Sequence, residues 1–177
     1  ESGKTKTAGE EITSVRAEEL CLEYFRDYSI DRADYAGEPS SETLATYNFF
    51  LYDNQGRQIF SRISKADGAL VGFEFYESCT EKNFDVERSK AIAEDYLAAL
   101  GYENMTAVWV NESGTQAIFH FAYEADGAVY YSDMVKVKVC ESKGKVVGLN
   151  AVAFLSNHHT REGVTTSISL EAAQEKL

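Results

Sequence analysis

The sequence predicts an α+β protein in which a helix packs on an antiparallel β-sheet, and it predicts this arrangement twice. The hydrophobic period changes from helical to alternating at two points of the 177-residue chain, as expected where strands follow a helix. Most connectors between the alternating runs contain glycine, which tolerates the positive φ of tight hairpins. The two halves also overlay: 12–25 aligns with 84–97 at an offset of 72 residues, and the runs that begin at Gly68 and Gly144 align at an offset of 76.

The first half begins with an imperfect helical stripe over 12–28. The stretch 31–42, which holds the only proline, then interrupts the pattern. Beyond it the residues alternate between apolar and polar, which is the period of a strand with one buried face. We therefore expect three strands, at 46–53, 57–64 and 69–77.

The second half begins with a strongly amphipathic helix over 84–102. Asp85 stands where an N-cap is expected, and Gly101 stands where a left-handed C-cap is expected. Four strands are predicted to follow. In the long one, three valines (135, 137 and 139) should face the core while Lys136 and Lys138 face solvent. The expected ranges of these strands are 106–112, 116–124, 129–141 and 145–156.

The composition argues against several classes of function. The net charge is −12 and the pI is about 4.7, which disfavours nucleic-acid binding because that needs a basic surface. No run of 18 apolar residues is present, as a membrane-spanning helix would need. The three cysteines are odd in number and lack C-x-x-C spacing. We therefore expect buried free thiols rather than a disulfide framework or a zinc site.

Two of the three histidines, His158 and His159, are adjacent after the last apolar run. In a strand, neighbouring side chains point to opposite faces, so the pair cannot easily chelate one metal ion. The third, His120, lies on another strand at no metal-binding spacing. We expect Asn157 and His158 to anchor the strand end through hydrogen bonds to backbone, with His159 exposed, and we predict neither a metal nor a cofactor.

The sequence also favours a protein without catalytic residues. A Cys140–His120 pair on adjacent strands is conceivable, but a thiol in an apolar strand is more often inert packing. A glycosidase needs a specific pair of carboxylates, and no pair is distinguished by its context among the 29 acidic residues. We interpret these carboxylates as solvated surface charge. The pairs considered are Glu74 with Glu77 and Asp126 with Asp133.

Adjacent aromatic residues must divide between the two faces of their strands. Phe49 and Phe50, and likewise Phe75 and Tyr76, cannot both enter one core. The residues left on the second face fit either packing between the two halves or an exposed patch that docks a partner protein. A sheet edge that accepts a partner strand is a further alternative.

The second half contains the patterns F-x-F-x-Y at 119–123, Y-x-D-x-V-K-V-K-V at 131–139, G-x-V-V-G at 144–148 and L-x-N-H at 155–158. With these motifs the chain resembles the PepSY region of the YpeB family of spore-germination proteins. The similarity is close from about 84 to 161 and looser in the first half. One difference is Ser132, where the family often has proline; we expect only a small change in strand-edge geometry. The matching motif residues include Tyr131, Asp133, Lys136, Lys138, Asn157, His158 and Arg161, and these are the candidate partner-binding or family-motif residues.

The resemblance implies tandem PepSY-like units, each with one helix packed on an antiparallel sheet. The implied division is a flexible N-terminus over 1–11, a divergent unit over 12–80, a second unit over 81–162, and the start of a truncated third unit over 163–177. Units of about 70 residues have limited cores, so they should pack on each other, on the missing unit or on a partner.

The resemblance also implies a non-catalytic role in spore germination. Proteins of this family hold and stabilise a cortex-lytic transglycosylase of the SleB type, on the outer side of the forespore inner membrane. The membrane anchor would be an N-terminal segment that this chain lacks, and self-association stays open. The alternatives are a PepSY-type protease inhibitor or propeptide-like chaperone, and, less favoured, a hydrolase with paired acidic residues.

Overall fold

The computed structural model describes residues 11–39 and 44–159. In these ranges eight strands form one antiparallel sheet in the order β1-β2-β3-β4-β8-β7-β6-β5. The α+β class predicted from the sequence is confirmed. The strands are β1 (Ile30–Gly37), β2 (Thr46–Asp53), β3 (Gln58–Ser64), β4 (Leu70–Phe75), β5 (Met105–Ser113), β6 (Gln116–Ala125), β7 (Ala128–Cys140) and β8 (Lys145–Asn150), and the helices are α1 (Ser14–Tyr24), α2 (Val86–Ala99), α3 (Val152–Asn157) and the 3₁₀ turn η1 (Arg26–Tyr28).

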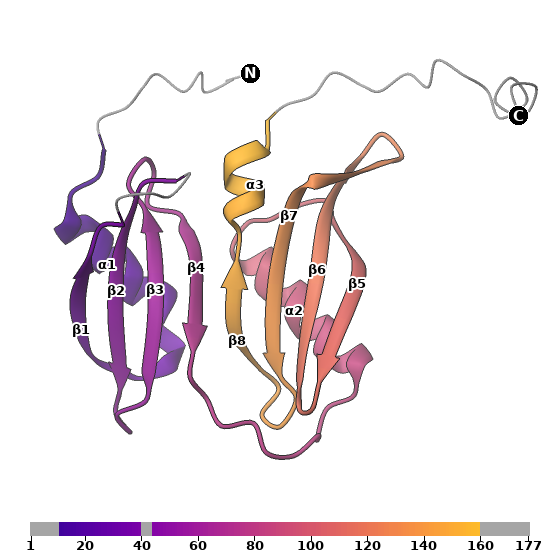
Figure 1. The fold of residues 1–177 in the computed structure, drawn as a ribbon, viewed down its shortest axis with the longest axis horizontal. Helices are drawn as coiled ribbons and strands as arrows, with labels where there is room; N and C mark the ends of the chain where they lie inside the picture. The colour runs from indigo at the N-terminus through magenta and orange to yellow at the C-terminus, as the bar shows by residue number, and fades with distance from the viewer. Residues whose placement is uncertain (1–10, 40–43, 160–177) are drawn as a thin grey trace, which may run out of the picture.

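The order of a helix and four strands occurs twice, as α1 with β1–β4 and α2 with β5–β8. The two four-stranded parts join through their last strands, because β4 pairs antiparallel with β8. Figure 1 shows the result as a continuous sheet, with α1 behind the first half and α2 behind the second. The two halves therefore pack on each other edge to edge, one of the arrangements expected for units with small cores.

Each main helix begins at a side-chain cap. Thr13 accepts a hydrogen bond from the backbone N–H of Arg16 at 3.1 Å, and Asp85 accepts one from the N–H of Arg88 at 2.9 Å. Such bonds satisfy N–H groups that have no partner within the helix. After α2, Gly101 has φ +85°, the left-handed geometry expected there. The predicted cap positions of the second helix are therefore confirmed.

A single hydrophobic core lies between the helices and the sheet. Ala17 and Cys21 of α1 and Ala93 and Leu97 of α2 supply the buried helical side chains. The valines 135, 137 and 139 of β7 are fully buried, as the alternation predicted. The aromatic pairs also divide as expected: Phe49 and Phe75 are buried, Tyr76 is exposed, and Phe50 contacts Phe60 on the opposite face.

Two elements differ from the sequence prediction. The stretch expected to interrupt the first half contains β1, an edge strand that pairs with β2 alone among the described strands. The predicted strand 145–156 ends at Asn150, and the apolar residues beyond it form α3. Asn150 accepts a hydrogen bond from the N–H of Val152 at 3.1 Å, and the chain turns there to place α3 beside β7 and β4 (Figure 1).

Candidate functional site

The junction between the two halves of the sheet is built around two glycines. Opposite Gly72 lies Asn150, and opposite Gly148 lies Glu74, with Phe73 facing Leu149 between them. A Cβ atom on Gly72 would lie 2.8 Å from the backbone oxygen of Leu149, so any larger residue would push the strands apart. The absence of side chains at both glycines keeps the sheet surface low along this line.

Two adjoining hollows lie over the junction, with volumes of about 140 and 230 Å³. They open on the face of the sheet that α1 and α2 do not cover, which we call the open face. Lys138 forms an ion pair with Glu74 across the junction. Lys136, two residues before Lys138 on the same face of β7, is exposed. The residues that line the hollows include Phe60, Arg62, Glu74, Ile118, Lys136 and Lys138.

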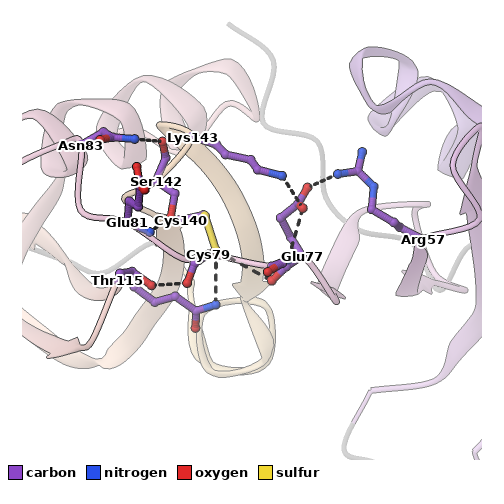
Figure 2. The surroundings of a disulfide bond; sticks show 11 residues. Arg57, Glu77, Cys79, Glu81, Asn83, Thr115, Cys140, Ser142 and Lys143 are labelled. Atoms are coloured by element: carbon purple, nitrogen blue, oxygen red, sulfur yellow. Dashed lines mark hydrogen bonds and ion pairs between the residues drawn. A yellow bond between two sulfur atoms is a disulfide. The ribbon is translucent and has the colours of Figure 1, made fainter.

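A buried carboxylate joins the two halves just beyond the end of β4. The side chain of Glu77 is only 3% exposed, and it lies just after β4. One carboxylate oxygen accepts a hydrogen bond from Arg57 Nη1 at 2.6 Å, and the other accepts one from Lys143 Nζ at 2.5 Å. Figure 2 shows Glu77 between these two cations, Arg57 from the turn between β2 and β3 and Lys143 from the turn between β7 and β8.

These contacts decide the ionisation of Glu77. Burial by itself raises the pKa of the carboxyl, but the hydrogen bond from Lys143 and the charge of Arg57 outweigh it, so the net pKa is lowered. The interpretation of Glu77 as a solvated surface charge was wrong. Its position two residues after a strand gave no sign that cations from both halves would converge on it.

The segment that follows Glu77 is fixed to the second half by a disulfide between Cys79 and Cys140, which are 61 residues apart in sequence. Figure 2 shows this bond beside Glu77. The hydroxyl of Thr115 donates to the Cys79 carbonyl at 2.5 Å. The expectation of free thiols is therefore wrong for this pair, because the connecting segment crosses the end of β7, which no spacing rule reveals. It is confirmed for Cys21, which is buried and unpaired; burial raises the pKa of its thiol to about 12.

A second group of motif residues meets where α3 follows β8. Asp133 of β7 is fully buried, and its carboxylate lies 2.8 Å from His158 Nδ1. The imidazole stacks on Phe154 with ring centroids 4.3 Å apart. The amide of Asn157 donates to the Ser132 carbonyl at 3.0 Å. This contact set fixes the end of α3 to β7.

The structure modifies the expectation for the histidines. Asn157 does bond to backbone, as predicted, and His159 is exposed. His158 instead bonds to the side chain of Asp133, because the chain has turned into α3 and no longer runs as a strand. The interpretation of Asp133 as surface charge was therefore wrong. Ser132, noted for replacing a proline, supplies both the carbonyl for Asn157 and a hydroxyl 2.6 Å from Asp133 Oδ1.

The seven candidate residues thus fall into separate places. Asp133, Asn157 and His158 come together at the end of α3. Lys136 and Lys138 lie on the open face, as the alternation predicted. Tyr131 is 60% exposed, and Arg161 lies outside the described residues, as do the expected start of a third unit and almost all of the expected flexible N-terminus.

His120 and Cys140 do not form a catalytic pair. Cys140 is in the disulfide, and the residue opposite His120 on β7 is Lys136. The His120 ring stacks on Trp109 with centroids 4.4 Å apart, and its Nε2 lies 3.3 Å from the Asn111 amide nitrogen. Burial, followed by the charge of Lys136, lowers its pKa.

Across the described ranges, no group of three or more histidine, cysteine or acidic side chains is arranged to hold a metal ion. Within the same ranges, none of the helices has the length and apolar character needed to cross a bilayer.

The repeated order of elements, the shared sheet and the clamp at Glu77 define a tandem α+β repeat protein whose two halves form one body. The chain belongs to the YpeB sporulation family: the family described as YpeB sporulation, PepSY1 and PepSY2 domains, matches residues 1–163. The predicted resemblance is confirmed.

Individual relatives agree with this assignment. The chain is 24% identical over 168 residues to the sporulation protein YpeB of Halalkalibacterium halodurans, covering 94% of this chain and 37% of that protein. It is 25% identical over 171 residues to the sporulation protein YpeB of Oceanobacillus iheyensis, covering 96% and 38%. The chain thus spans well under half the length of these relatives.

A solved structure shares the fold. The Bacillus megaterium YpeB C-terminal domain superposes with a TM-score of 0.84 at 20% identity, covering 96% of this chain and 76% of that one. The likeness at this identity is one of architecture: two joined helix-and-sheet units.

Proposed function

We propose that this chain is a non-catalytic binding and stabilising module in bacterial spore germination, and that it holds a SleB-type cortex-lytic enzyme in the spore. The observation that carries the proposal is membership of the YpeB sporulation family over residues 1–163. The expected place is the outer side of the inner spore membrane, which the whole protein would reach through a segment outside this chain.

The architecture supports a role in binding. The antiparallel pairing of β4 with β8 makes a wide, continuous sheet, and the Glu77 contacts fix the halves on either side of it. A rigid surface loses little entropy when it associates, which favours affinity. The buried Asp133 and its histidine partner are accounted for by anchoring α3, so these titratable groups need no catalytic role.

The test is direct binding, measured by calorimetry, of this chain to a purified SleB-type enzyme. Its peptidoglycan-binding domain and its catalytic domain are also measured separately. We expect saturable binding to one of the two domains, with a Kd at or below about 10 μM. The domain that binds distinguishes control of cortex access from control of the active site. Absence of binding to either domain and to the intact enzyme, with the chain shown to be folded, would contradict the proposal.

A further inference from the structure

Cations outnumber carboxylates in the lining of the hollows over the β4–β8 junction. The hollows over the β4–β8 junction are lined by three cations, Arg62, Lys136 and Lys138, against one carboxylate, Glu74. The chain as a whole has a net charge of −12. A local group of cations on so acidic a protein favours contact with acidic segments of a partner.

One of these cations is available for a partner. Lys138 is neutralised by Glu74. The side chain of Arg62 lies over Gly72, where a Cβ atom on the glycine would be 3.1 Å from Arg62 Nη2. Lys136 is exposed, and in the part of the chain that the structure describes it takes part in no ion pair. It also lies opposite His120, whose pKa its charge helps to lower after burial.

The shape of the surface suits an extended segment. The floor runs along the junction at Gly148–Asn150, and apolar side chains stand on both sides of it, Phe60 from β3 and Ile118 from β6. The strands β3 and β6 are four strand spacings apart, or roughly 19 Å, which leaves room for one extended chain between these two side chains. Apolar walls with a cationic rim fit a segment that alternates apolar and acidic residues.

We propose that the groove over the β4–β8 junction binds an extended acidic polypeptide segment of a partner protein, with Lys136 contacting its carboxylates. This deepens the proposed function and rests on it for the identity of the partner. The recognition chemistry itself does not depend on which enzyme supplies the segment.

The first experiment uses a synthetic probe, the ten-residue peptide (Glu-Val)5, titrated into the full 177-residue chain by calorimetry at low salt. The neutral peptide (Gln-Val)5 is the matched control. We expect the acidic peptide to bind with a Kd below about 1 mM, the neutral one to bind at least about fivefold more weakly, and the affinity to fall as salt is raised.

Variants then locate the site. Lys136→Glu reverses the exposed charge in the groove, and Lys90→Glu makes the same change on α2, behind the sheet, where the Lys90 side chain is 40% exposed. Both alter the net charge equally. We expect Lys136→Glu to weaken the acidic peptide about tenfold and Lys90→Glu to leave its affinity within about twofold. Circular dichroism is used to check that both variants are folded.

The outcomes separate this inference from the proposed function. No binding of (Glu-Val)5, equal binding of the two peptides, or an equal effect of the two variants would overturn the groove as an acidic-segment site. If the peptide binds as expected while a SleB-type enzyme does not bind, the groove stands and the proposed partner falls. If the enzyme binds with equal affinity to the wild-type chain and to Lys136→Glu, the partner stands and the groove is overturned as its docking site.

Discussion

Gly72 of β4 and Gly148 of β8 occupy equivalent positions in the two halves of the sheet, separated by the same 76 residues that align the sequence repeats. Each lies opposite the residue two positions beyond the other glycine, with Phe73 and Leu149 paired at the centre. The pairing therefore has a local two-fold character. A duplicated strand has been used to join the two copies through the same edge.

The two glycines are not equally constrained, and this gives a matched pair of variants. A Cβ on Gly72 would lie 2.8 Å from the Leu149 backbone oxygen, which cannot move without opening the sheet. A Cβ on Gly148 would lie 3.1 Å from a Glu74 carboxylate oxygen and from Lys138 Cβ, and side chains adjust more easily than backbone. We predict that Gly72→Ala lowers the free energy of unfolding by about 1–3 kcal/mol, and that Gly148→Ala lowers it by less.

Urea denaturation of both variants checks this prediction. Equal losses, or a larger loss for Gly148→Ala, would mean that the strand junction is not the tight contact described. A change in the denaturant slope for Gly72→Ala would indicate that the two halves had begun to unfold separately.

The adjacent histidines provide a second comparison. His158→Ala removes the partner 2.8 Å from the buried Asp133 carboxylate and the ring stacked on Phe154. We expect a loss of about 1–3 kcal/mol, since a buried charged acceptor loses a hydrogen bond. His159→Ala removes an exposed side chain and should change stability by less than about 0.5 kcal/mol.

Thermal denaturation measures both variants, and hydrogen exchange of α3 and the adjoining end of β7 shows where the effect lies. Faster exchange in the His158→Ala variant should be concentrated there. If the two alanine variants are equally stable, the Asp133–His158 contact does not anchor α3.

The strand whose bounds the sequence predicted most accurately has a regular burial pattern. From Tyr47 to Asp53, β2 alternates between buried and half-buried residues, and its predicted range coincides with the observed one. β1 has no such alternation, because it is an edge strand on which only three of eight residues are even half-buried. The residues after Asn150 are apolar, which fits both a continued strand and a short helix. The length of the run alone cannot distinguish the two.

The contacts between the two halves could not be predicted from the sequence, for a different reason. Glu77, Arg57 and Lys143 lie in three connecting segments that meet only after both halves have folded and joined. Cys79 and Cys140 lie in separate elements as well. The alternation of β7, in contrast, placed Lys136 and Lys138 on the solvent face correctly, because one strand determines that by itself.

The Glu77 clamp predicts a pH-dependent contribution to stability. The pKa of Glu77 is lowered in the folded chain, so its stabilisation is present above the unfolded value of about 4.3 and is lost as the pH falls through the folded value. We expect Glu77→Gln to be less stable than wild type by about 1–3 kcal/mol near neutral pH. The difference should shrink as the pH approaches about 3.

Urea midpoints measured from neutral to acidic pH give this difference directly. Glu81→Gln, in the same connecting segment but exposed, is the control and should follow the wild-type curve. A difference between Glu77→Gln and wild type that stayed constant down to about pH 3 would show that the carboxylate charge is not what stabilises the junction.

The cysteines predict a thiol count that depends on folding. Cys79 and Cys140 are paired and Cys21 is buried. In the native chain, none of the three cysteines should therefore react with a thiol reagent within minutes near pH 8. Burial raises the pKa of Cys21 to about 12, and only the thiolate reacts. The unfolded, unreduced chain should expose one reactive thiol, and Cys21→Ala should expose none.

Replacing both Cys79 and Cys140 with serine should lower stability by about 2–4 kcal/mol, because it frees the connecting segment from the end of β7. The loss should appear equally in wild-type protein treated with a reductant, and a reductant should have no further effect on the double variant. Two or three reactive thiols in the unfolded, unreduced wild type would contradict the disulfide.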